Sequence, residues 1–204
     1  MMMNSLPVIG LVGGIGAGKS SVAKILAELG CVVSDSDAQA RAALRDPRIK
    51  DPILKWWGER VLDRQGEIDR AAVAQIIFAD PVERRRLESI VHPWVEARRR
   101  ELFAHAKPEA PALVIDAPLL LEAGLDRECD AILYVEADRP TRLARLAATR
   151  GWNPQELGKR EQSQLPLDEK RRRADHIVQN NGDLSELTLQ VRRVLDQIVD
   201  SCRK

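Results

Sequence analysis

The residues best suited to chemistry form one short stretch, GGIGAGKS at positions 13–20. It matches the pattern G-x-x-x-x-G-K-[ST], with Gly13, Gly18, Lys19 and Ser20 at the defining positions. Glycines leave successive backbone N–H groups free to turn inward around a phosphate. Lys19 would reach the β- and γ-phosphates of a nucleotide, and the Ser20 hydroxyl would hold Mg²⁺. The stretch therefore predicts a nucleotide-binding phosphate loop.

The segments on either side of this loop are suited to positioning it. Residues 8–12 form a short apolar run that is typical of a buried strand. Beyond the loop, apolar residues recur at helical spacing, at Val22, Ile25, Leu26 and Leu29. A helix that follows a glycine-rich loop aims its N-terminal N–H groups and its dipole at a bound anion. This context favours nucleotide binding over a flexible glycine turn.

Three aspartates follow predicted strands. Asp35 and Asp37 come at and just after the end of the run CVVSD, and Asp116 ends the run ALVID. In an open parallel sheet, the carboxyl ends of the strands face the ligand crevice. A carboxylate at Asp35 or Asp37 could accept a proton from an attacking hydroxyl, and Asp116 could lie beside Mg²⁺. Although a lone aspartate usually caps a helix, three behind a phosphate loop favour catalysis.

Strand and helix patterns alternate along the chain and predict an α/β fold, a five-stranded parallel sheet flanked by helices. The five strand candidates are residues 8–12, 31–35, 112–116, 131–137 and 176–180. Between the second and third candidates the pattern is helical, with Pro81 and Pro93 each expected to open a helix.

The chain's 204 residues suit a single domain with an inserted subdomain. We expect its core at about 1–37 and 111–204, with a helical insertion at about 38–110. A basic helical segment at about 139–175 is expected to form a lid, whose arginines would stabilise a transferring phosphoryl group.

The composition excludes several classes of protein. A formal net charge of +1 argues against a general nucleic-acid binder. No apolar stretch approaches the length of a membrane span, and no basic region precedes the first apolar run as in a signal sequence. Cys31, Cys129 and Cys202 are far apart, which is typical of free thiols in a reducing cytosol. We therefore expect a cytoplasmic protein that binds a small molecule, with no nucleic-acid or membrane partner, as a monomer or weak oligomer.

The ordered set of motifs resembles the dephospho-CoA kinase family over nearly the whole chain. The matching stretches are IGLVGGIGAGKSSVA at 9–23, DSDAQAR at 35–41, LESIVHP at 87–93, VIDAPLLLEAGL at 114–125, R-x-x-x-Q at 160–164 and EKRRRADHIVQNNGDLSEL at 169–187. The phosphate loop alone is generic, whereas the set in this order is specific.

The resemblance implies a nucleoside-kinase-like core that transfers the γ-phosphate of ATP, with Mg²⁺, to the 3′-hydroxyl of the dephospho-CoA ribose. It implies that the helical insertion binds CoA. It implies that Asp35 is the base, that Lys19, Asp116 and Arg145 assist catalysis, and that Asn180 approaches the ATP base. The implied acceptor pocket contains Asp35, Asp37, Arg41 and His92. The implied ATP loop is Gly13, Gly14, Ile15, Gly16, Ala17, Gly18, Lys19, Ser20 and Ser21.

One departure from the family pattern affects the lid. Family members often read R-L-x-A-R-x-G, whereas residues 145–151 read RLAATRG. Arg145 keeps its place, but Thr149 stands where a second arginine is expected, and Arg150 is one position later, about 100° around a helix. Which of the lid arginines meets ATP is therefore left open by the sequence.

Two other functions remain open. The chain could be another small kinase, acting on a nucleoside monophosphate or a metabolite, or a regulatory switch that binds nucleotide and turns it over slowly. The helical insertion and the paired aspartates favour a kinase. The dependence of ADP release on an acceptor would discriminate among these alternatives.

Overall fold

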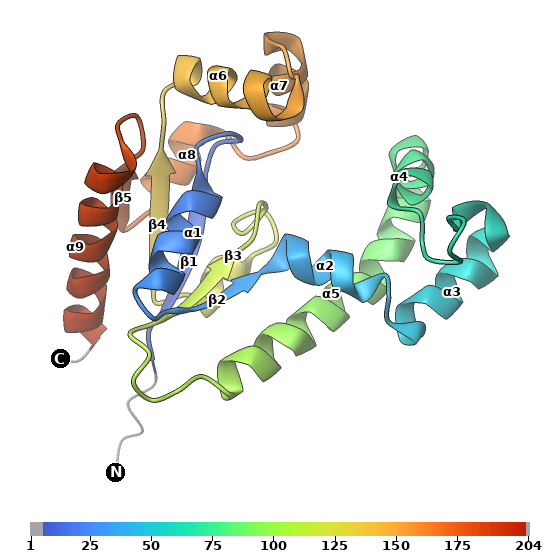
Figure 1. The fold of residues 1–204 in the computed structure, drawn as a ribbon, viewed down its shortest axis with the longest axis horizontal. Helices are drawn as coiled ribbons and strands as arrows, with labels where there is room; N and C mark the ends of the chain where they lie inside the picture. The colour runs from blue at the N-terminus through green and yellow to red at the C-terminus, as the bar shows by residue number, and fades with distance from the viewer. Residues whose placement is uncertain (1–5, 203–204) are drawn as a thin grey trace. The chain divides into compact units, whose positions relative to one another are not determined.

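The computed structural model describes residues 6–202, which divide into two compact units (Figure 1). One unit combines residues 6–35 with residues 105–202, and the other consists of residues 36–104.

The first unit is built around a parallel sheet. Its strands are β1 (Val8–Gly13), β2 (Val32–Asp35), β3 (Leu113–Asp116), β4 (Ala131–Glu136) and β5 (His176–Gln179). They lie in the order β2-β3-β1-β4-β5, and all the neighbouring pairs are parallel. The predicted five-stranded parallel sheet of an α/β fold is therefore confirmed. Because β1 is central, the loop that follows it leaves the middle of the sheet's carboxyl edge.

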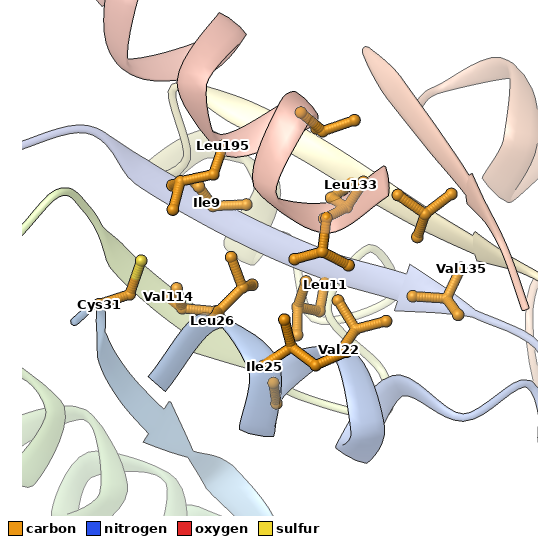
Figure 2. Close-up of a cluster of buried hydrophobic side chains, with 14 of the residues drawn as sticks. Ile9, Leu11, Val22, Ile25, Leu26, Cys31, Val114, Leu133, Val135 and Leu195 are labelled. Carbon is orange, nitrogen blue, oxygen red and sulfur yellow. The ribbon is translucent and has the colours of Figure 1, made fainter. Parts of the chain in front are cut away.

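Helices α1 (Lys19–Glu28) and α9 (Leu184–Cys202) pack with the strands into one buried apolar cluster (Figure 2). Leu26 of α1, Leu195 of α9 and Ile9 of β1 belong to this cluster, and each is at least 96% buried. Burying an apolar side chain of this size stabilises the fold by about 1.5–3 kcal/mol. The cluster therefore fixes the start of α1, and with it the end of the glycine-rich loop.

Three helices follow β4, namely α6 (Arg139–Arg150), α7 (Pro154–Glu161) and α8 (Leu167–Arg172), and the short helix η2 (Leu125–Glu128) precedes it. The N-caps of α6 and α7 are Asp138 and Asn153, whose side chains accept hydrogen bonds from backbone N–H groups of the first turn. Gly151 ends α6 in the left-handed region, at φ 65°. Within residues 6–202, no helix has the length and apolar character needed to cross a membrane.

The second unit is helical. It contains α2 (Ser36–Ala43), α3 (Pro47–Trp57), η1 (Gly58–Val61), α4 (Arg70–Ala79) and α5 (Pro81–Ala104) around its own apolar cluster. Pro81 opens α5 as predicted, but the expectation that Pro93 opens another helix is wrong. The helix continues through Pro93 because Leu87, Val91 and Val95, at successive steps of four, stay buried on one face.

Candidate active site

The glycine-rich loop connects β1 to α1, as the sequence predicts. Gly13 ends β1, Lys19 begins α1, and Gly18 between them has a φ of 90°, in the left-handed region that disfavours side chains. The Lys19 ammonium donates a hydrogen bond of 3.2 Å to the carbonyl oxygen of Gly13. This bond folds the lysine side chain back over the loop, where a bound phosphate would meet it.

Arg145 and Asn180 contact this loop from two other elements. Asn180, which follows β5 and is 6% exposed, donates a hydrogen bond of 2.8 Å from Nδ2 to the carbonyl of Ala17. Arg145 of α6 donates to the same carbonyl at 3.4 Å, and to Asn180 Oδ1 at 3.3 Å. A Cβ on Gly18 would lie 2.1 Å from Asn180 Nδ2, so only glycine permits this approach. The fold therefore brings these distant residues together at the loop.

Arg142, which lies three residues before Arg145, also contacts the loop. Its side chain is 4% exposed, and Nη1 donates to the carbonyl of Ile15 at 3.1 Å and to Glu161 Oε1 at 2.6 Å. Arg139 donates to the other carboxylate oxygen of Glu161 at 2.8 Å. Partial burial alone would raise the pKa of Glu161, but the hydrogen bonds from both arginines outweigh burial and lower it. Glu161 is therefore held as a carboxylate beside the loop.

Thr149 and Arg150, where the sequence departs from the family pattern, make contacts away from the glycine-rich loop. The Thr149 hydroxyl donates a hydrogen bond of 2.7 Å to the carbonyl of Arg145, within the helix. The guanidinium of Arg150 lies 5.0 Å from the ring centre of Trp152, and that of Arg160 lies 4.4 Å from the same ring. The arginines of α6 that contact the loop are thus Arg142 and Arg145, and Arg150 stacks on an aromatic ring instead.

Asp35 and Asp116 end two neighbouring strands. They are register partners in the β2–β3 ladder, and Asp116 is also the partner of Leu11 in the central strand. Partners in a parallel ladder project from the same face of a sheet, and neighbouring strands lie about 4.8 Å apart. The two carboxylates therefore leave the carboxyl edge of the sheet side by side, next to the strand that leads into the loop.

Three predicted acceptor residues belong to the helical unit. Asp37 lies in the first turn of α2 and Arg41 in its last turn, four residues further on, so the two share one face of the helix. His92 lies on α5 and is exposed. Their part in binding an acceptor remains a prediction from the sequence.

Ser20 and Asp116 offer oxygen donors of the kind that magnesium prefers. Across residues 6–202 there is no group of three or more histidine, cysteine, aspartate or glutamate side chains that could hold a metal. Magnesium in kinases usually binds one or two protein oxygen ligands together with substrate phosphates. Ser20, in the first turn of α1, and Asp116, at the end of β3, are oxygen donors of this kind. The residues present thus fit a Mg²⁺ ion that is bound jointly with a nucleotide.

Reasoning from the sequence did not single out Arg142 or Glu161, although Arg142 belongs to the basic segment expected to form a lid. Arg142, Arg145 and Thr149 follow the spacing i, i+3, i+7, which places them on one face of a helix. That spacing was a usable signal for Arg142. Glu161 had no comparable signal, because its contact depends on how α7 folds back toward α6.

Comparisons with known proteins identify the family to which this chain is similar. The sequence model of the family described as dephospho-CoA kinase matches residues 7–186. A dephospho-CoA kinase of Symbiobacterium thermophilum is 42% identical over 186 residues, which cover 90% of this chain and 78% of that protein.

Two solved structures are also similar. The Thermus thermophilus protein TT1252 is 34% identical to this chain, and the two structures align with a TM-score of 0.82. The alignment covers 94% of this chain and 97% of that one. A dephospho-CoA kinase of Campylobacter jejuni, at 21% identity, has a TM-score of 0.70, covers 95% of this chain and 98% of that one, and supports the fold alone. On the family match and the identity to its relatives, this chain belongs to the dephospho-CoA kinase family.

Proposed function

We propose that this protein transfers the γ-phosphate of ATP to the 3′-hydroxyl of the ribose of dephospho-CoA, giving CoA and ADP. The observation that carries the proposal is the loop of residues 13–18, which Lys19, Arg145 and Asn180 contact in a chain that matches this family over residues 7–186. The reaction class follows from the loop, and the acceptor follows from the family.

The loop would bind the polyphosphate of ATP. Backbone N–H groups of residues 14–18 and the N-terminus of α1 would donate hydrogen bonds to phosphate oxygens. Lys19 would neutralise charge on the β- and γ-phosphates, and the bond from Lys19 to Gly13 keeps the ammonium near them. Arg145 would assist from α6, and Asn180 would approach the adenine.

Ser20 would hold Mg²⁺ together with the phosphates, and Asp116 would lie beside the ion. When bound, the ion neutralises charge on the polyphosphate and fixes its orientation. Both side chains offer oxygen atoms, which magnesium prefers.

Asp35 would orient the acceptor hydroxyl. The oxygen of the 3′-hydroxyl forms a bond to the γ-phosphorus while the bond from that phosphorus to the β,γ-bridging oxygen breaks, and the hydroxyl proton passes to the carboxylate. An alcohol has a pKa far above 7, so the proton moves late, when the new bond is largely formed. Positioning and charge neutralisation then supply most of the acceleration. Asp37, Arg41 and His92 would bind other groups of the acceptor.

The remaining expectations complete the proposal. Small-molecule substrates are the expected partners, the site of action is the cytoplasm, and the protein acts as a monomer or weak oligomer. Residues 38–110 would bind the CoA moiety and residues 139–175 would act as the lid. Cleavage by a protease within 139–175 should slow when ATP is added, and unchanged cleavage would argue against lid closure.

The test is Mg²⁺-dependent release of ADP from ATP, with and without dephospho-CoA, with the product identified by mass. Release that requires dephospho-CoA, with a product one phosphoryl group heavier, supports the proposal. Release with AMP or another acceptor only would assign a different kinase, and slow release independent of any acceptor would assign a switch.

Two aspartate variants test the role of Asp35. Asp35→Ala should bind ATP normally and lose turnover, by about 100-fold or more. Asp200→Asn, on an exposed position of α9, is the matched control and should be unchanged. Near-normal turnover in the Asp35 variant would remove Asp35 from the mechanism.

A further inference from the structure

We propose that Arg142 is a second phosphate-binding arginine of the transfer reaction, and that Glu161 competes with nucleotide phosphates for its guanidinium. The inference rests on the proposed function and extends it to a side chain outside the glycine-rich loop. It answers which arginines of α6 serve the reaction, a question that Thr149 leaves open in the sequence.

The position of Arg142 over the loop is the first argument. Arg142 and Arg145 lie one helical turn apart on the same face of α6, and both donate to loop carbonyls, those of Ile15 and Ala17. A Cβ on Gly14 would lie 3.0 Å from Arg142 Nη1, so the bare backbone lets the guanidinium approach closely. The loop and α6 thus bring a second cation to where phosphates would bind.

The local charge balance is the second argument. Arg139 and Arg142 share one carboxylate, that of Glu161, so this group of three carries one positive charge in excess. The Nε of Arg142 is buried and has no hydrogen-bond partner among residues 6–202. A buried guanidinium donor without an acceptor is costly, and an anion that supplied the missing acceptor would be favoured there.

A cavity beside these groups is the third argument. It has a volume of about 220 Å³ and is lined by Ile15, Arg139, Arg142, Glu161 and Gln164, among others. This is room for several water molecules or a phosphoryl group. The cavity thus adjoins the loop, Arg139 and Arg142, and the Glu161 carboxylate that a phosphate would displace from Arg142.

The exchange itself follows from the chemistry of arginine. A guanidinium binds phosphate through parallel N–H donors at least as well as it binds carboxylate. When the polyphosphate enters the loop, its oxygens would replace Glu161 as acceptors for Arg142, and Glu161 would keep Arg139. Because hydrogen bonds from the two arginines lower its pKa, Glu161 is ionised at neutral pH and competes at full charge.

The test compares two variants with opposite expected signs. ATP affinity is measured by calorimetry without acceptor, and turnover is measured with dephospho-CoA. Arg142→Gln should raise the ATP dissociation constant about tenfold, the value of one charge-assisted hydrogen bond, and lower kcat by about 100-fold. Glu161→Gln should lower the ATP dissociation constant several-fold, since the competitor loses its charge. In the double variant, Glu161→Gln should no longer tighten binding.

The control is Arg150→Gln, since Arg150 stacks on Trp152 at the end of the same helix. It should change ATP affinity less than twofold. If Arg142 merely ties α6 to the loop, Glu161→Gln will weaken ATP binding together with Arg142→Gln, and that result, or no change in either variant, overturns the inference. If Arg142→Gln does not fold, a failure of Glu161→Gln alone to tighten ATP binding still overturns it. Wild-type protein that binds ATP but ignores dephospho-CoA would refute the proposed function, while the two affinities would still decide the role of Arg142.

Discussion

Removing one partner of the ion pair between Lys170 and Glu122 should destabilise the sheet unit far more than removing one partner of a surface ion pair. The Lys170 side chain is 2% exposed, and its ammonium lies 2.9 Å from Glu122 Oε1 and 3.0 Å from Gln164 Oε1. The same Glu122 oxygen accepts a hydrogen bond of 2.8 Å from the backbone N–H of Leu165. Burial raises the pKa of Glu122, but these hydrogen bonds outweigh it and lower the pKa overall. The pair thus joins α8 to the turn after β3.

The expected magnitude follows from the burial of the two partners. Removing one partner of a buried pair leaves an uncompensated charge and costs about 3–5 kcal/mol. Because Glu122 is 19% exposed, water relieves part of this, and we expect Glu122→Leu to cost about 3 kcal/mol. The double variant Glu122→Leu, Lys170→Met removes both charges and should recover about 2 kcal/mol of that loss. As a matched control, the exposed pair of Lys24 and Glu28 on α1 should contribute about 0.5 kcal/mol or less.

The assay must report the sheet unit separately from the helical unit. Of the four tryptophans, Trp56, Trp57 and Trp94 lie in the helical unit, so fluorescence reports mainly that unit. Amide hydrogen exchange of peptides that contain β3, β4 and β5 reports the opening of the sheet. Urea unfolding followed by far-UV circular dichroism gives the global free energy for each variant.

The reasoning fails if Glu122→Leu destabilises the protein no more than breaking the exposed pair of Lys24 and Glu28 does. It also fails if the double variant is less stable than Glu122→Leu alone, because the cost would then come from lost packing and not from a stranded charge. A loss confined to the helical unit in hydrogen exchange would contradict the location of the effect.

Three further predictions concern the loop and the helical unit. Gly18→Ala should raise the ATP dissociation constant at least tenfold by calorimetry with little loss of helix by circular dichroism, because the new Cβ would meet Asn180 at a φ that disfavours side chains. Lys19→Ala should weaken ATP binding and lower kcat/KM for ADP release with dephospho-CoA more than about 100-fold, since charge on the phosphates stays uncompensated. Asp46 accepts hydrogen bonds from Arg48 and from Trp94 Nε1, and these bonds lower the pKa of the Asp46 carboxyl. The stability that the carboxylate supplies is therefore present above about pH 4, and it is lost at lower pH as the carboxyl protonates. Urea midpoints followed by tryptophan fluorescence should fall more steeply between pH 5 and pH 2.5 in the wild type than in Asp46→Asn, and equal slopes would remove Asp46 as the cause.

The features that the sequence predicts best depend on neighbouring residues. The stretch GGIGAGKS predicts its own conformation, because left-handed glycines and the start of a helix are local properties. The N-cap of α4 at Asp69 is equally local, since its carboxylate accepts from the N–H of Ala71. Pro93 shows the limit of such reasoning. A proline usually opens or breaks a helix, but Pro93 lies inside α5, which continues because Val91 and Val95 are buried in the apolar cluster.

Residues that meet across long stretches of chain are harder to predict. Arg142 and Arg150 are both arginines of α6, and composition does not separate them. Helical spacing places Arg142 with Arg145 on one face and Arg150 off that face, but it does not say which face meets the loop. That depends on β4 lying beside β1 in the sheet, which sets where α6 begins. Any basic helix could show this spacing of arginines. Only the strand order, which places α6 beside the loop, identifies Arg142 as a specific candidate for phosphate binding.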